Sequence, residues 1–168
     1  HNQTIKSIVE IGVGDGSRTK RILEVAGWKA GEAGLKYTGI DLFEGRPEGT
    51  PGMSLKEAFH ALKTPNVKMQ FVPGDPYQAL ARTANMLANT DLLIVSSGLD
   101  EASLARAWMY VPRMLHANTL VYLHERTSGT TTSEGKPVPG TENYKRLTQI
   151  EVERLAAAGS KRSSRRAA

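Results

Sequence analysis

The sequence feature that most constrains the fold is a glycine-rich turn, Gly12-Val-Gly14-Asp-Gly16, between an apolar run and a helical segment. The β-branched run Ser7–Val13 is typical of a strand, and Ser17–Ala30 of a helix. Glycines in such a turn let the backbone approach a ligand without a Cβ in the way. The free N–H groups of the following helix favour a negatively charged or strongly polar ligand. We therefore expect a nucleotide-type binding site at this turn.

The rest of the chain alternates strand-like and helix-like segments. This order indicates an α/β fold, a doubly wound and mostly parallel sheet with helices on both faces. We expect strands at Ser7–Val13, Tyr37–Phe43, Val67–Val72, Asp91–Ser96 and Thr119–His124. We expect helices at Ser17–Ala30, Ser54–Lys63, Pro76–Ala88, Asp100–Leu115 and Thr141–Ala158. Ligands of such sheets bind at the carboxyl ends of the strands, near the turn after the first strand.

Length and composition bound the class of protein. The 168 residues are enough for one domain with a real core, and 39% hydrophobic with 23% charged residues is typical of a soluble globular protein. No run approaches the roughly 18 apolar residues of a membrane helix, and no signal peptide is visible. We expect a cytoplasmic protein with no membrane partner. The chain has no cysteine, which excludes disulfides, thiolate zinc sites and cysteine nucleophiles.

The net charge of +5 comes largely from one end of the chain. Residues 159–168 contain four cations and no acid: Lys161, Arg162, Arg165 and Arg166. Their Ser/Arg/Ala composition is typical of disorder. We therefore divide the chain into a domain at 1–158 and a basic disordered tail at 159–168. The folded domain lacks a basic groove in this reading, so we do not expect nucleic acid as a partner.

The glycine spacing separates two kinds of nucleotide site. A nicotinamide-binding turn reads G-x-G-x-x-G, but Ser17 stands where the third glycine would be. Together with Glu10 the turn reads Glu-x-Gly-x-Gly-x-Gly, which resembles motif I of class I S-adenosylmethionine (SAM) methyltransferases. The resemblance continues through Asp41 and Asp75, which end the second and third expected strands, and covers about residues 7–125. It implies a Rossmann-like sheet of strand order 3-2-1-4-5 and SAM as cofactor.

The resemblance also implies a role for each matching residue. The backbone of the three glycines would face the methionine part and ribose of SAM, and Glu10 would help hold the amino end. Asp41 would accept both ribose hydroxyls, because a carboxylate can take two donors. Leu42 would pack on the adenine, and Asp75, beside Pro76, would accept from the adenine amino group. The alternative for Asp41 and Asp75 is a loop or helix-cap acid; Asp before Pro is a favourable helix start. The implied cofactor-binding residues are Glu10, Gly12, Gly14, Gly16, Asp41, Leu42, Asp75 and Pro76.

Methyl transfer asks for alignment and sometimes a base. The candidate catalytic residues at strand ends are His124, whose imidazole could take a hydroxyl proton, and Asp100. The alternative for His124 is a structural or solvated side chain. The segment around Asp100 resembles the small-molecule O-methyltransferase type, but Ser96 and Ser97 occupy the place of that type's acid. Because hydroxyls are weak ligands, we expect no metal.

These observations favour SAM-dependent methyl transfer to a small-molecule acceptor. Two alternatives stay open: an NAD(P)-dependent oxidoreductase, because Asp41 would serve any ribose, and a non-catalytic SAM-fold binding domain. We expect no partner strand after Glu125, which would leave the fifth strand as an apolar edge and favour a homodimer. The polar loops Glu44–Gly52 and Thr127–Gly140 leave strand carboxyl ends, where they either cover a ligand or serve as plain connections.

Overall fold

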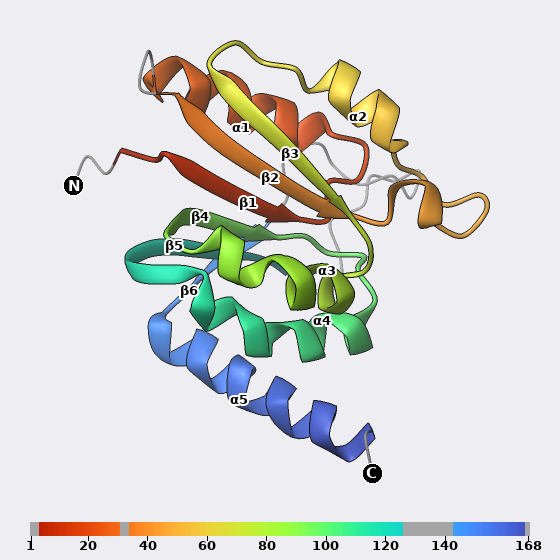
Figure 1. The fold of residues 1–168 in the computed structure, drawn as a ribbon, viewed down its shortest axis with the longest axis vertical. Helices are drawn as coiled ribbons and strands as arrows, with labels where there is room; N and C mark the ends of the chain where they lie inside the picture. The colour runs from red at the N-terminus through yellow and green to blue at the C-terminus, as the bar shows by residue number, and fades with distance from the viewer. Residues whose placement is uncertain (1–3, 31–33, 126–142, 167–168) are drawn as a thin grey trace, which may run out of the picture.

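A six-stranded sheet orders the fold (Figure 1). The computed structural model describes residues 4–30, 34–125 and 143–166. The strands are β1 (Ser7–Ile11), β2 (Leu35–Asp41), β3 (Val67–Pro73), β4 (Thr90–Val95), β5 (Leu115–Glu125) and β6 (Asn143–Leu147). Their order is β3-β2-β1-β4-β5-β6; the first five run parallel and β6 pairs antiparallel with β5. The predicted doubly wound fold and the order 3-2-1-4-5 are confirmed.

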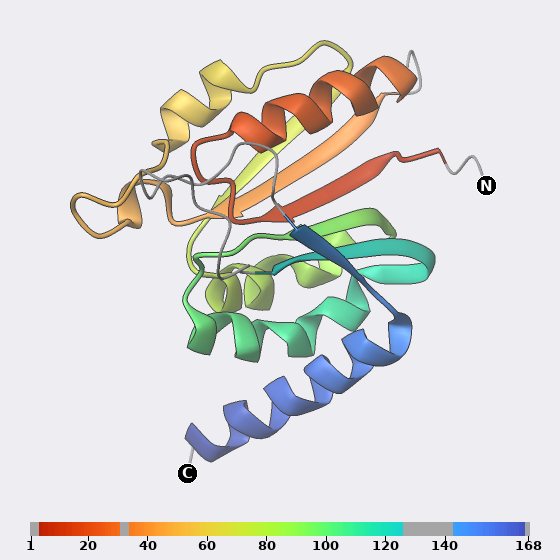
Figure 2. The same cartoon turned by 180° about the vertical axis from the view of Figure 1, so that it is seen from behind.

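Helices cover both faces of the sheet, as predicted. They are α1 (Ser17–Ala30), α2 (Leu55–Ala61), α3 (Pro76–Thr83), α4 (Glu101–Ala107) and α5 (Gln149–Arg166). Short 3₁₀ turns are η2 (Phe43–Gly45), η3 (Ala84–Leu87) and η4 (Trp108–Arg113). Figure 2 shows α1 and α2 on the near face, while α3, α4 and α5 lie on the far one. No helix within the described ranges is long and apolar enough to cross a membrane.

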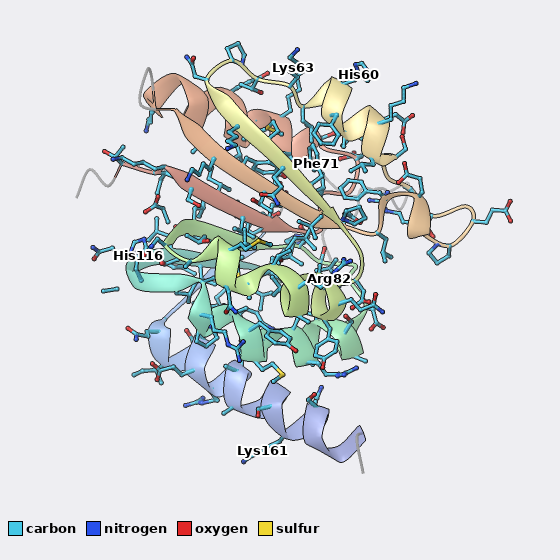
Figure 3. The ribbon with its side chains drawn as sticks, in the orientation of Figure 1. His60, Lys63, Phe71, Arg82, His116 and Lys161 are labelled. Carbon is cyan, nitrogen blue, oxygen red and sulfur yellow. The ribbon has the colours of Figure 1, made fainter. Side chains whose placement is uncertain are left out.

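Each face of the sheet has its own apolar core. Successive residues of β1 alternate between them: Ile8 packs toward α1 and α2, whereas Val9 packs toward α3 and α4. Phe71 and Val72 divide β3 in the same way. Phe71 also meets the ring of Phe59 edge-on at 4.8 Å between centroids, which ties α2 to β3 (Figure 3 labels Phe71). Burial on both faces explains the nearly continuous apolar composition of the strands.

Capping residues set where the helices begin. Ser54 and Glu57 form a reciprocal capping box at α2, and Asp75 and Asp100 cap α3 and α4. The third and fourth predicted helices are each shorter than expected and continue as 3₁₀ turns. In the fourth helix the cause is Pro112, which lacks the N–H that a regular helix needs.

The prediction that β5 forms an edge of the sheet is wrong. Asn143–Leu147, predicted as the start of a helix, is β6 and pairs along the carboxyl half of β5. Its residues alternate in strand fashion: Leu147 is buried in the core beside Val121, while Tyr144 and Arg146 share the other face. The alternation was not visible in the sequence, because three of the five residues in this segment are polar or charged. The argument for a homodimer at an unpaired β5 therefore loses its basis.

The boundary predicted at residue 158 has no counterpart in the secondary structure, because α5 continues through to Arg166. Packing explains the difference. Gly159 is buried against α4: a Cβ on it would lie 2.6 Å from the Ala105 carbonyl oxygen. Further along, Ser163 Oγ lies 3.3 Å from the Tyr77 hydroxyl. The predicted tail thus begins inside a helix–helix contact that its composition did not indicate.

Replacing Gly159 with alanine is expected to lower the free energy of unfolding by about 1–3 kcal/mol, because the added Cβ meets backbone atoms that cannot turn aside. Chemical denaturation measures this. The exposed neighbour Ser160 is the control, since alanine there improves helix propensity and should leave stability equal or slightly higher. A stabilised Gly159→Ala variant would show that α5 does not pack on α4.

Candidate functional site

The glycine turn after β1 is tight on one side and open on the other. Gly12 has φ +91°, and a Cβ on it would lie 2.8 Å from Ser96 Cβ at the end of β4. Gly14 has φ +64°, and a Cβ there would meet no atom within 4 Å. A Cβ on Gly16 would lie 2.5 Å from Met53 Cε. Gly14 is therefore the glycine whose open side faces free space, as a ligand-binding turn requires.

Asp41, at the end of β2, lies beside this turn and is 7% exposed. Its Oδ2 accepts from Gly14 N at 2.7 Å, and its Oδ1 from Leu42 N at 2.6 Å. Arg46 Nη2 lies 2.7 Å from Oδ2, close enough for an ion pair, although its N–H groups are not aimed for a hydrogen bond. Arg46 also donates to Met53 O at 2.7 Å, which folds part of the loop 44–52 across the carboxylate.

Glu10 lies in β1, is fully buried, and already has its acceptor positions filled. Its Oε1 accepts from Arg18, including Nε at 2.8 Å, and its Oε2 accepts from the hydroxyls of Thr19 at 2.7 Å and Tyr37 at 2.5 Å. A carboxylate has about four lone-pair sites, and these four bonds use them. In this structure Glu10 holds Arg18 rather than presenting a free oxygen to a ligand.

Arg18 is the central side chain that the sequence did not single out. Beyond Glu10, its Nη2 donates to Gly12 O at 2.7 Å and to Ser96 Oγ, and its Nη1 donates to the Tyr144 hydroxyl at 2.6 Å. Its side chain is 16% exposed, so the guanidinium reaches the surface at the ends of β1, β4 and β6. One sequence feature could have indicated this pair. Glu10 precedes the glycine turn in β1 and Arg18 follows it in α1, so the two opposite charges stand on either side of the turn.

His124, predicted as a base, lies at the end of β5 next to this group. Its ring stacks on Tyr144 with 4.9 Å between centroids, and its Nδ1 accepts from Ser97 N at 3.3 Å and contacts Ser97 Oγ. In the neutral ring this places the proton on Nε2 and turns the lone pair toward Ser97. Proton transfer through His124 would therefore pass by way of the Ser97 hydroxyl.

The other predicted residues lie around two helix starts. Asp75 Oδ1 accepts from Tyr77 N at 3.0 Å and Gln78 N at 3.1 Å and contacts Ser103 Oγ, so it is the cap of α3. Asp100 accepts from Ser103 N at 2.7 Å as the cap of α4. Ser103 thus links Asp75 and Asp100. The partner of the His124 Nδ1 is Ser97, so this nitrogen is not bonded to either acid. Pro76 is buried at the first position of α3, and Leu42 is half-buried beside Asp41.

Charge and burial together hold this network in one protonation state. Burial lowers the pKa of Arg18, but the charge and hydrogen bonds of Glu10, with those of Tyr144, raise it above its ordinary value. Burial raises the pKa of Tyr37 well above its usual value, and Glu10 raises it further. At neutral pH the group is therefore a buried ion pair with a neutral tyrosine donor. Such a pair is costly to break from one side.

Tyr37 gives the fold a specific weakness at alkaline pH. A folded-state pKa above the unfolded value of about 10 contributes stability below pH 10, and this stability is lost as the pH rises further. We expect the melting temperature to fall more steeply above pH 10 in the parent than in Tyr37→Phe. At pH 7 that variant should be about 1.5–3 kcal/mol less stable, because Glu10 loses a donor. Tyr122→Phe is the control and should keep the parent slope; equal slopes in all three would contradict the account.

The described ranges contain no group of three or more His, Cys, Asp or Glu side chains that could hold a metal ion. Hollows of about 550 and 1020 Å³ among the described residues lie toward the amino ends of the strands. Figure 3 labels His116 at that end of the sheet and Arg82 near the opposite end, where Arg82 donates to Pro73 O at 2.8 Å. The loop 127–140, predicted to leave the same end as the turn, lies outside the described residues.

The strand order, the glycine turn and the acid that ends β2 agree with the class that the sequence resembles. The described strands form a Rossmann-like sheet of order 3-2-1-4-5, which the resemblance to class I SAM methyltransferases implied, with β6 as an added antiparallel strand. No family model matches the sequence, and no curated protein matches it either.

Comparison with solved structures gives distant likenesses to methyltransferases. The MycE methyltransferase from the mycinamycin biosynthetic pathway, in complex with Mg and S-adenosylhomocysteine (SAH), is 14% identical; the match covers 74% of this chain and 28% of MycE, with a TM-score of 0.46. CalO1, a methyltransferase in calicheamicin biosynthesis in its SAH-bound form, is 15% identical over 94% of this chain and 43% of its own, with a TM-score of 0.48. A SAM-dependent methyltransferase from Agrobacterium tumefaciens is 10% identical over 76% and 41%, with a TM-score of 0.43. The chain spans less than half the length of each.

Proposed function

We propose that this chain binds SAM at the carboxyl ends of β1 and β2 and takes part in methyl transfer to a small-molecule acceptor. The observation that carries the proposal is the pairing of an open glycine with a buried acid. Gly14 N donates to Asp41 Oδ2 at 2.7 Å, while the Cβ direction of Gly14 meets nothing within 4 Å. A ligand on the open side of Gly14 would lie beside a carboxylate suited to a ribose diol.

The neighbours of Asp41 determine how much room a ribose would have. Gly14 N and Leu42 N use two of the roughly four acceptor positions of the carboxylate, while Arg46 Nη2 lies 2.7 Å from Oδ2 without a hydrogen bond to it. Two positions remain for the ribose hydroxyls, and the one beside Arg46 becomes available once that side chain moves aside. The adenine would then extend toward Leu42 and the start of α3, where Asp75 is engaged as a helix cap.

The methionine end of SAM would meet a cation in this site. Glu10 has no free acceptor position, and Arg18 already donates to Gly12 O, one of the carbonyls at the turn. Because the Glu10–Arg18 pair is costly to break, the guanidinium stays in place. We therefore expect the carboxylate of the ligand, rather than its ammonium group, to face Arg18.

SAM supplies an electrophilic methyl group on a sulfonium. The protein's part is to align donor and acceptor, with Ser97 and His124 in reach of a proton at the end of β5. The acceptor is expected to be small because the segment around Asp100 resembles the small-molecule O-methyltransferase type. A domain that binds SAM without turnover would share every feature except the acceptor chemistry.

Calorimetric titration of the purified chain tests the proposal. SAM and SAH should bind, NAD should not, and Asp41→Asn should weaken SAM binding about tenfold, or about 1.4 kcal/mol, through loss of a charged acceptor. Glu44→Gln is the control and should bind as the parent does, because the Glu44 carboxylate lies in the same loop region and accepts from Leu55 N rather than from the glycine turn. Tight binding of NAD in place of SAM would favour the oxidoreductase; equal SAM affinity in Asp41→Asn would place the ligand elsewhere.

A further inference from the structure

The face of β1, β2 and β3 that lies toward α3 is covered only in part. Helix α3 has eight residues and packs over the carboxyl halves of the strands, and η3 then leads away to β4. Figure 1 shows β2 and β3 with no helix in front of their amino-terminal halves. There the structure forms an open groove of about 1020 Å³ between the strands and the η3 segment. We call this the lysine groove, for its lining residues Lys6, Lys36 and Lys68. The expectation that the folded domain lacks a basic groove is therefore wrong; strand pairing brings together lysines that stand far apart in the sequence.

The strand register brings two of these cations together. Lys36 of β2 and Lys68 of β3 are direct register partners, so both side chains stand on the same face of neighbouring strands. Like charges in this position cost stability. Both lysines are exposed, and neither forms an ion pair or a side-chain hydrogen bond with the residues that the structure describes. An interior strand of a parallel sheet is usually apolar on both faces, so Lys36 is exceptional in β2.

The positive charge of the three lysines is not neutralised by Asp91, the acidic residue in the lining of the groove. Asp91 Oδ2 accepts from Lys6 N at 2.8 Å and Ser7 N at 2.9 Å. Its Oδ1 lies 3.0 Å from His116 Nε2. Because these backbone and imidazole contacts occupy Asp91, the ammonium groups of the three lysines stay available to an anion from outside.

The remaining lining indicates the kind of anion. Amide side chains that can bond a peptide backbone surround the lysines: Asn66, Gln70 and Asn89. Met86 is 70% exposed at the rim and offers an apolar contact. Of the aromatic rings in the lining, Tyr37 is 1% exposed and the His116 imidazole is engaged by Asp91, so the groove offers little surface on which nucleic-acid bases could stack. The volume of the groove, about 1020 Å³, is at the upper limit of small-ligand pockets, which favours an occupant larger than a small ion. The groove also reaches β3, the outer strand of the sheet, where an extended chain can enter from the side.

We infer that the lysine groove binds an acidic, extended polypeptide segment of a partner protein. Carboxylates of the segment would pair with Lys36 and Lys68 and relieve their mutual repulsion. The inference is independent of the proposed methyl transfer, because the groove lies at the opposite ends of the strands from the glycine turn.

Fluorescence anisotropy tests it with a short labelled peptide that carries Glu at alternate positions. The peptide should bind the parent at low salt and lose affinity as salt rises, and the version with Gln at every Glu should not bind. The double variant Lys36→Gln/Lys68→Gln should lose roughly tenfold in affinity. The charge-matched control Lys20→Gln/Lys56→Gln, on exposed positions of α1 and α2, should bind as the parent does.

Thermal melting of the groove variant should match or exceed the parent, since it loses a like-charge pair. Three results would each overturn the inference: no binding of the acidic peptide to the parent, equal loss in both double variants, or single-stranded RNA that binds more tightly than the peptide and depends on the same two lysines. The last would assign the groove to nucleic acid.

Discussion

Arg18→Met should lower the free energy of unfolding by about 3 kcal/mol, the largest stability effect we expect from one substitution in this chain. The change removes the cation from Glu10, which is fully buried and keeps only the Thr19 and Tyr37 hydroxyls. Removing one partner of a buried pair costs about 3–5 kcal/mol, and the partial exposure of Arg18 favours the lower figure. Chemical denaturation at neutral pH measures the loss.

A double variant separates charge from packing. Glu10→Gln/Arg18→Met keeps an acceptor for Thr19 and Tyr37 but leaves no unpaired charge, so it should recover more than half of the stability lost by Arg18→Met. If Arg18→Met costs less than about 0.5 kcal/mol, Glu10 is not held by Arg18 in solution. If the double variant is no more stable than the single one, the loss reflects packing rather than an uncompensated charge.

Gly14→Ala should abolish measurable SAM binding, with at least a hundredfold loss of affinity. Its Cβ would enter the open space in which we place the ligand, while the protein itself offers nothing within 4 Å to clash with it. The cost in stability should be small, roughly 1–2 kcal/mol for a positive φ in a residue with a Cβ. Calorimetry with SAH and a melting curve measure the two effects separately.

Gly34→Ala is the matched control for this variant. Gly34 also has positive φ, at +72°, and its Cβ would have only an ordinary 3.7 Å contact with Asn66 O, at the other end of β2. We expect a similar loss of stability and unchanged SAH affinity. Tight SAH binding in Gly14→Ala would mean that the open side of the turn is not the ligand site.

The parts of this fold that follow from short-range patterns were predictable from the sequence. Both faces of β1 and β4 are buried, so their apolar runs stand out, and the glycine turn marks the point between β1 and α1. Asp75 and Asp100 were recognisable as acids at strand ends, and both are helix caps, a role that local sequence determines.

Long-range packing decided the rest. β6 is a short polar strand stabilised by pairing with β5, and Gly159 extends α5 through close contact with α4; neither has a local signal. The local sequence does not distinguish Arg18 from other helix cations, because its importance comes from Glu10, Ser96 and Tyr144, which the fold brings together from distant positions in the chain. The sequence located the candidate site but not the cation inside it.

Two-dimensional ¹H–¹⁵N spectra during titration with SAH test the central claim most directly, because each backbone amide reports its own surroundings. The account predicts that the largest shifts fall on Gly12, Gly14, Gly16 and Leu42, with little change at Lys36 and Lys68 near the amino ends of β2 and β3. Saturable shifts that cluster away from the glycine turn, or no shifts at all, would contradict it.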